Sequence, residues 1–174
     1  MALFDWLTGR AKQDASGSDT ETVRRIVSKL NQIDPARARH LAAFAYVLSR
    51  AANADLQISD VETAKIVEIL MTHGGLPEDQ ALLVTEIANS QNKLFGGTEN
   101  FLVTREFKEI ASGEERRQLL DCLFAVSAAD DAITGEEEGQ IWQIASELGF
   151  THEEYVNARL AYSDKRTVLR RKKD

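Results

Sequence analysis

Two short acidic stretches of this sequence carry carboxylates at spacings that could bind a cation. Residues 54–62 read Ala-Asp-Leu-Gln-Ile-Ser-Asp-Val-Glu, and residues 129–137 read Ala-Asp-Asp-Ala-Ile-Thr-Gly-Glu-Glu; we call them the first and second acidic turns. The second follows the first at an offset of 75 residues without a gap. Hard cations such as Ca²⁺ and Mg²⁺ require clusters of oxygen ligands of this kind. The candidate metal ligands are Asp55, Glu62, Asp130 and Glu137.

The glutamates of both turns have a second interpretation that needs no metal. Glu62 follows Ser59, and Glu137 follows Thr134, by three positions. This spacing is the capping box, in which the two side chains bond backbone N–H groups at the start of a helix. Acidic residues in the first helical turn also favour the helix dipole. A cap does not require the aspartates of the two turns, so the metal hypothesis depends mainly on them.

Helices are the elements that must position these turns. Apolar residues recur at intervals of three and four through most of the chain, and no segment shows the sustained alternation of a half-buried strand. Proline before a helix and glycine after one mark several boundaries. We place Gly74 in the left-handed conformation at the end of one helix. The expected helices lie near residues 20–31, 34–53, 59–73, 98–110, 114–128, 134–149 and 151–162, and a further helix begins at 77.

The predicted fold is all-α: a single compact bundle of about seven to eight helices built from two pseudo-repeated halves, residues 36–92 and 113–162. Each half alone would expose an apolar face, so we expect the halves to pack together. Three segments are expected along the chain. They are a short apolar segment with a flexible linker at 1–19, the helical domain at 20–162, and a basic C-terminal tail at 163–174.

The net charge is unevenly distributed along the chain. Residues 163–174 carry +4 and the whole chain carries −7, which leaves −11 on the rest. An acidic body repels phosphates, so no specific nucleic acid is expected as a partner, whereas a cation or a basic protein fits. Two interpretations of the basic tail stay open. It is a solvated, frayed helix end, or it contacts an anionic surface: lipid, nucleic acid, or the acidic body of another copy.

Sequence features that would indicate an enzyme or an exported protein are missing. There is no His-Glu-x-x-His, no phosphate-binding Gly-x-x-x-x-Gly-Lys and no Gly-x-Ser-x-Gly. Cys122 is the only cysteine, and its apolar helix neighbours favour a buried, inert thiol rather than a nucleophile. The first ten residues do not have the pattern of a signal peptide, and no apolar stretch is long enough to span a membrane. We therefore expect a cytoplasmic protein.

The doubled pattern Ala-Asp-x-x-Ile-Ser/Thr-x-x-Glu resembles the tellurite-resistance TerB-like family of bacterial proteins, as does Glu-Leu-Gly-Phe-Thr-His-Glu-Glu-Tyr at residues 147–155. The resemblance covers about residues 22–162. It implies an all-helical domain of two related halves, associated with tellurite and other stress responses, with acidic residues proposed to bind metal and no enzymatic activity. One position departs from the family, which usually has Gly after the motif Asp, where this chain has Leu56 and Asp131. Asp tolerates a positive φ better than Leu, so the first acidic turn is expected to differ in shape.

These observations support three functional hypotheses. The first is a non-enzymatic TerB-like module of a tellurite, stress or metal-related response, which binds a divalent cation (Ca²⁺ or Mg²⁺) and acts through a protein partner. The second is an adaptor at a membrane surface or in an assembly, with peripheral membrane contact through the apolar N-terminal segment and the basic tail. The third, metal-assisted hydrolysis at the acidic cluster, has no nucleophile or base to support it.

Overall fold

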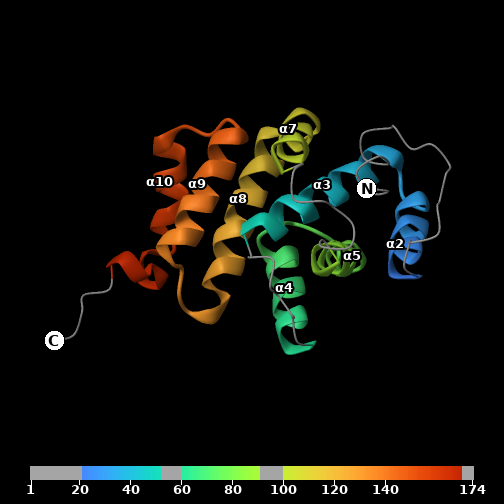
Figure 1. Cartoon of the computed structure of the whole chain (residues 1–174), viewed down its shortest axis with the longest axis horizontal. Helices are drawn as coiled ribbons and strands as arrows, with labels where there is room; N and C mark the ends of the chain where they lie inside the picture. Colours follow the sequence, from blue (N-terminus) through green and yellow to red (C-terminus); the bar gives the residue numbers. More distant parts are fainter. Residues whose placement is uncertain (1–20, 52–59, 91–99, 170–174) are drawn as a thin grey trace.

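The computed structural model describes residues 21–51, 60–90 and 100–169, and every regular element in these ranges is helical. The all-α prediction is therefore confirmed (Figure 1). Three short 3₁₀ turns, η1 to η3, lie at Ala128–Asp130, Ser163–Lys165 and Thr167–Leu169. The α-helices are α2 (Glu21–Asn31), α3 (Pro35–Ala51), α4 (Asp60–Thr72), α5 (Glu78–Asn89), α7 (Asn100–Ile110), α8 (Gly113–Ser127), α9 (Gly135–Glu147) and α10 (His152–Leu160).

The duplication read from the sequence recurs in the helices. Helix α4 begins at residue 60 and ends at 72, and α9 begins and ends 75 positions later. The helices that follow them, α5 and α10, begin 74 positions apart, at residues 78 and 152. In the sequence, each acidic turn thus leads into the second of the three helices of its half, α4 or α9.

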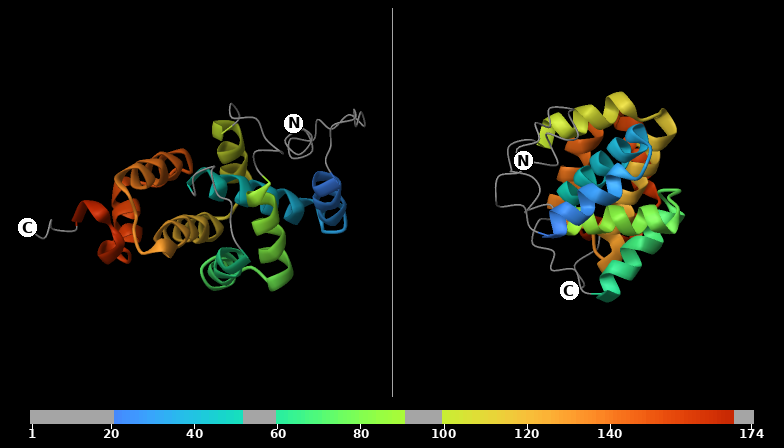
Figure 2. Two further views of the ribbon diagram at one scale, coloured as in Figure 1. Left: turned by 60° about the horizontal axis from the view of Figure 1, so that its bottom comes forward. Right: turned by 90° about the vertical axis from the view of Figure 1, so that its right-hand side faces the viewer.

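Helix α3 lies at the centre of the bundle, and helices of both halves pack against it. It contacts α5 of its own half, α8 and α9 of the other half, and α7 between them (Figures 1 and 2). From Ala38 to its end, α3 is buried everywhere except at Arg39. A helix buried on all sides belongs to the core, and its many alanines allow neighbouring backbones to approach closely. Through α3 the two halves share one core, as expected.

The glycines that end α4 and α9 differ from the prediction in one respect. Gly149 has φ 90° and ends α9, but in the first half the left-handed residue is Gly75 (φ 64°) rather than Gly74. Gly74 is needed for a different reason, because a Cβ there would lie 2.6 Å from the carbonyl oxygen of Leu70. The left-handed glycine thus lies three residues after the end of α4 but two residues after the end of α9. The prediction that Gly74 is left-handed was wrong.

Residues 163–169, the C-terminal strap, are bonded to the second acidic turn of their own chain. The Ile133 N–H donates to the Lys165 carbonyl at 2.8 Å, and the Thr167 N–H donates to the Ile133 carbonyl at 2.9 Å. These two bonds form an isolated parallel bridge between Ile133 and Arg166. This arrangement was not among the two interpretations of the basic tail. The rest of the tail and the apolar segment 1–19 lie outside the described residues.

Candidate functional site: the second acidic turn

A left-handed residue shapes the second acidic turn. After α8 the chain makes the 3₁₀ turn η1, and Asp131 then adopts φ 66° and ψ 12°. Its N–H donates to the Ala128 carbonyl at 2.9 Å. Asp reaches this conformation more readily than other non-glycine residues. Asp131 thus has the positive φ that the sequence led us to consider at this position. The corresponding residue of the first acidic turn, Leu56, lies outside the described residues.

The second half of the turn is fixed by a buried anchor and a helix cap. Ile133 is fully buried in the core. Thr134 is the N-cap of α9: its hydroxyl accepts from the Glu137 N–H at 3.2 Å, and its own N–H donates to Glu137 Oε2 at 2.8 Å. The capping box predicted here is confirmed. Glu137 therefore has a structural role, and a role as a metal ligand stays a prediction.

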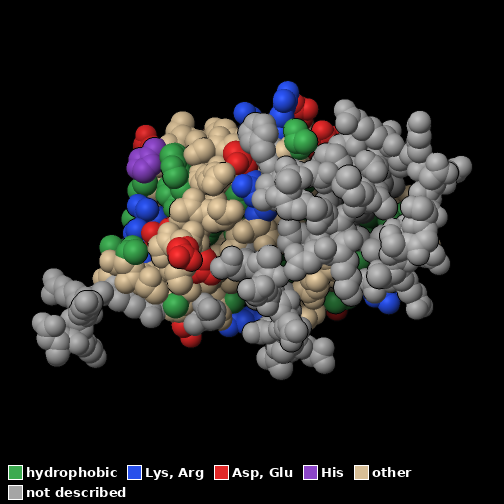
Figure 3. Space-filling model, viewed as in Figure 1, with side chains coloured by type: hydrophobic (Ala, Val, Ile, Leu, Met, Phe, Trp, Pro, Cys, Tyr) green, Lys and Arg blue, Asp and Glu red, His purple; other side chains and the backbone are tan. Residues whose placement is uncertain are grey.

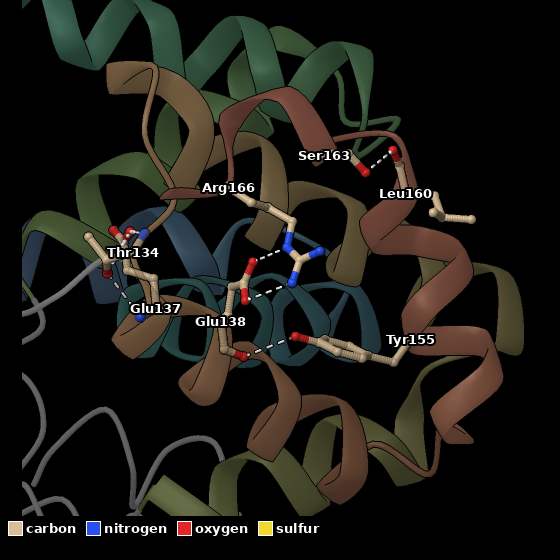
Figure 4. A network of polar contacts seen from close by, with 7 residues as sticks. All are labelled: Thr134, Glu137, Glu138, Tyr155, Leu160, Ser163 and Arg166. Carbon is tan, nitrogen blue, oxygen red and sulfur yellow. Dashed lines mark hydrogen bonds and ion pairs between the residues drawn. The ribbon is translucent and has the colours of Figure 1, made fainter. Parts of the chain in front are cut away.

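Glu138, the residue after the turn, forms an ion pair with Arg166 of the strap. Both carboxylate oxygens accept from the guanidinium, with the Oε2 contact at 3.2 Å. The side chains are only 11% and 12% exposed. Figure 4 shows the two side chains directed at each other, with the Tyr155 hydroxyl donating to the Glu138 backbone carbonyl at 3.1 Å. A bidentate contact of this kind between arginine and a carboxylate gives geometric specificity as well as attraction.

Two further basic groups reach the same turn. Lys165 of the strap donates to Asp131 Oδ1 at 2.6 Å, although the Asp131 side chain is 83% exposed. Lys65, on α4 of the first half, donates to the backbone carbonyl of Ala129. The negative charge of the turn is thus partly balanced by the chain itself. Figure 3 shows both acidic and basic side chains on the described part of one face of the molecule.

The four predicted metal ligands are only partly within the described structure. Glu137 is described and caps α9. For Glu62 in α4 and Asp130 in η1 only the backbone is described, and Asp55 lies outside the described ranges. The prediction that these four carboxylates are metal ligands is therefore untested. Among side chains that the structure does describe, no group of three or more His, Cys, Asp or Glu residues is placed to hold a metal ion.

Sequence reasoning missed a polar cluster beside Cys122. His73 Nδ1 lies 2.6 Å from Asp121 Oδ2, and the Tyr162 hydroxyl donates to Asp121 Oδ1 at 2.8 Å. Burial, with a smaller contribution from Asp121, raises the pKa of the Cys122 thiol to about 12. Thiolates rather than thiols are nucleophilic, so the prediction of a buried, inert thiol is supported.

One further helix cap was missed although the sequence carried its signal. Ser112 and Glu115 form a capping box at the start of α8, with the Ser112 N–H donating to Glu115 Oε1 at 3.0 Å. The spacing is the same Ser/Thr-x-x-Glu pattern that predicted the cap of α9. By contrast, no local pattern indicates that Lys165 and Arg166 will meet the acidic turn.

Comparison with protein families identifies one match. The family model described as tellurite resistance protein TerB matches residues 40–160. This span contains both acidic turns and ends just before the C-terminal strap. No curated protein and no solved structure matches the chain. None of the helices in the described ranges has the length and apolar character needed to cross a membrane.

Proposed function

The chain belongs to the TerB family, and from this premise we propose that it is a non-catalytic helical module of a bacterial tellurite- or metal-stress response. We place it in the cytoplasm, acting through a protein partner. The observation that carries the proposal is the construction of the second acidic turn. A left-handed Asp131, the buried Ile133 and the cap by Glu137 hold the backbone of this acidic turn in a defined shape.

The proposal includes a divalent cation, Ca²⁺ or Mg²⁺, at this turn. Asp130 and Glu137 would hold it, with Asp55 and Glu62 as the corresponding pair in the first turn. Capping does not exclude ligation, because a carboxylate offers about four lone-pair sites and the cap uses one oxygen of Glu137. When bound, the cation would add positive charge to that of Lys65 and Lys165, which reach the turn from other parts of the chain.

Calorimetric titration of the full chain with Ca²⁺, Mg²⁺ and Zn²⁺ tests this part of the proposal. Glu137→Gln is the informative variant, because glutamine also serves in a capping box but lacks the charge. We expect Glu137→Gln and Asp130→Asn each to weaken binding at least about tenfold, since hard cations prefer charged oxygen ligands. Thermal unfolding should show that Glu137→Gln keeps the fold.

Glu136→Gln is the matched control, because it removes the same charge from the first turn of α9 at an exposed position outside the cap. It should bind metal within about twofold of the wild type, since no ligand is lost. An absence of binding at millimolar metal, or unchanged binding in Asp55→Ala/Asp130→Ala, would remove the metal from the proposal.

A second candidate function is an adaptor at an anionic membrane surface. Three apolar side chains near the C-terminal end are largely exposed: Leu160 at 63%, Val168 at 56% and Leu169 at 54%. Four basic residues follow directly in the sequence, at 170–173. Exposed apolar groups beside basic residues suit the interface of an anionic bilayer.

Co-sedimentation with phosphatidylserine vesicles tests the membrane candidate. We expect the full chain to sediment with the vesicles and Val168→Ser/Leu169→Ser to remain largely in the supernatant, because the apolar contact with the bilayer is lost. Leu82→Ser, at an exposed apolar position on α5, is the control for loss of surface apolarity. Equal behaviour of the chain with and without vesicles rules this candidate out.

A further inference from the structure

We infer that the second acidic turn, together with Glu138, is a docking site for a short basic peptide, and that the C-terminal strap occupies this site within the chain. The inference rests on the proposed function and deepens it, because it states the chemistry of the partner that acts at the same turn. The partner segment carries two consecutive basic residues, as Lys165 and Arg166 do in the strap.

Main-chain hydrogen bonds to Ile133 would hold a docked peptide whatever its side chains are. Both the N–H and the carbonyl of Ile133 are bonded to the strap, at 2.8 and 2.9 Å. Ile133 is itself fully buried, so its position is fixed by the core. Extended peptides bind many proteins by adding main-chain hydrogen bonds of this kind to an exposed backbone edge.

Charge pairing supplies the part that selects a basic segment. Arg166 reaches the partly buried carboxylate of Glu138, whose backbone carbonyl is held by the Tyr155 hydroxyl. Lys165 reaches Asp131 at the exposed rim. Lys165 ends the 3₁₀ turn η2 and Arg166 follows it in an extended conformation, and one of these two basic residues meets each carboxylate.

The strap is held in a way that allows exchange. None of its residues is buried, and Val168 and Leu169 are more than half exposed. The ion pairs that hold it differ: the Lys165–Asp131 pair at the exposed rim contributes little net stability, whereas the Arg166–Glu138 pair is largely withdrawn from water and is costly to break only when Glu138 is left without a partner. Segments with few buried apolar contacts open locally without global unfolding. A partner peptide thus competes with a tethered occupant whose effective concentration is on the order of millimolar.

A labelled peptide of residues 163–169, Ser-Asp-Lys-Arg-Thr-Val-Leu, tests the site by fluorescence anisotropy. The full chain with Lys165→Ala/Arg166→Ala keeps the site but weakens its internal competitor. We expect this variant to bind the peptide at least about tenfold more tightly than the wild type does, because a tether of this length competes strongly. Equal affinity for the two proteins overturns the inference.

Two matched controls separate docking from general charge attraction. Adding Glu138→Gln to the double variant should weaken binding at least about tenfold, because the arginine loses its charged partner. Arg170→Ala/Arg171→Ala removes the same charge from the neighbouring sequence and should bind the peptide as the wild type does. Binding that survives Glu138→Gln contradicts the assignment of the site.

Amide hydrogen exchange in the wild-type chain gives an answer that needs no variant. Excess unlabelled peptide should accelerate exchange at Thr167, whose N–H loses the Ile133 carbonyl when the strap leaves. Exchange at Ile133 should stay slow, because a peptide carbonyl replaces that of Lys165. Unchanged exchange at Thr167 under saturating peptide overturns the inference. The anisotropy and exchange experiments are run with a chelator present. A negative result in them therefore counts against peptide docking and not against metal binding, and a negative metal titration does not count against peptide docking.

Discussion

At the scale of single residues, the left-handed Asp131 is the most sensitive point of the site. We predict that Asp131→Leu, which introduces the residue of the first acidic turn, lowers the free energy of unfolding by about 1–2 kcal/mol relative to Asp131→Asn. Asn loses the charge that pairs with Lys165 but still accepts a positive φ. Urea unfolding of the two variants isolates the backbone effect, and equal midpoints would contradict it.

His40 is a second residue with a measurable consequence. Burial lowers its pKa below the ordinary value of about 6.5; the Glu115 carboxylate, 3.2 Å away, opposes this shift and Arg37 adds to it. The folded chain thus keeps His40 neutral where the unfolded chain binds a proton. Its contribution to stability is present above about pH 6.5 and is lost as the pH falls, at up to about 1.4 kcal/mol per pH unit.

Urea unfolding between pH 7.5 and 5.5 measures this effect. We predict that His40→Leu loses less stability over that range than the wild type, because its linked proton is gone. Glu115 does not interfere in this window. Burial raises the pKa of Glu115, but hydrogen bonds from Ser112 and neighbouring positive charge lower it below its usual range.

At the scale of helices, an ion pair in the interior joins three of them. Arg50 on α3 donates to Glu147 on α9 at 2.6 Å and to Thr104 on α7 at 2.6 Å. Both charged side chains are largely withdrawn from water. We predict that Arg50→Met lowers the free energy of unfolding by about 3–5 kcal/mol, because Glu147 loses its partner.

A double-mutant cycle checks the origin of that loss. Arg50→Met/Glu147→Met should be less destabilised than Arg50→Met alone, because no unpaired charge then remains in the interior. If the double variant loses the sum of the two single losses, the pair does not interact and the prediction is wrong. Arg105→Met, in the exposed pair with Glu109, should change stability by less than about 1 kcal/mol.

The helices were predictable because their signals are local. The expected starts lie within about two residues of the observed ones, since caps and prolines act on neighbouring residues. The end of α4 was harder. Gly75 is left-handed, whereas Gly74 has to be glycine because a Cβ there would lie 2.6 Å from the Leu70 carbonyl oxygen and 3.2 Å from Cys122 Sγ on another helix. Short-range sequence patterns carry no information about that contact.

At the scale of the whole molecule, the sequence predicted the fold class and the duplication. It did not predict the contact between the C-terminal strap and the second acidic turn. Periodicity alone predicts helices, and the repeat predicts two halves. The strap contacts join residues 28 and 34 positions apart, as Arg166–Glu138 and Lys165–Asp131 do. The uneven charge distribution is compatible with such contacts, but net charge alone does not identify which acidic residues the basic residues will contact.

The position of the strap along the chain has a consequence for biosynthesis. During translation the N-terminal part of a protein folds first. The second acidic turn precedes the strap, and the family-matched span ends at residue 160. A nascent chain that has reached this point already contains Ile133, Asp131 and Glu138, but it lacks the segment that is bonded to them. The contacts between the strap and the second acidic turn therefore form only after the family-matched domain has been synthesised.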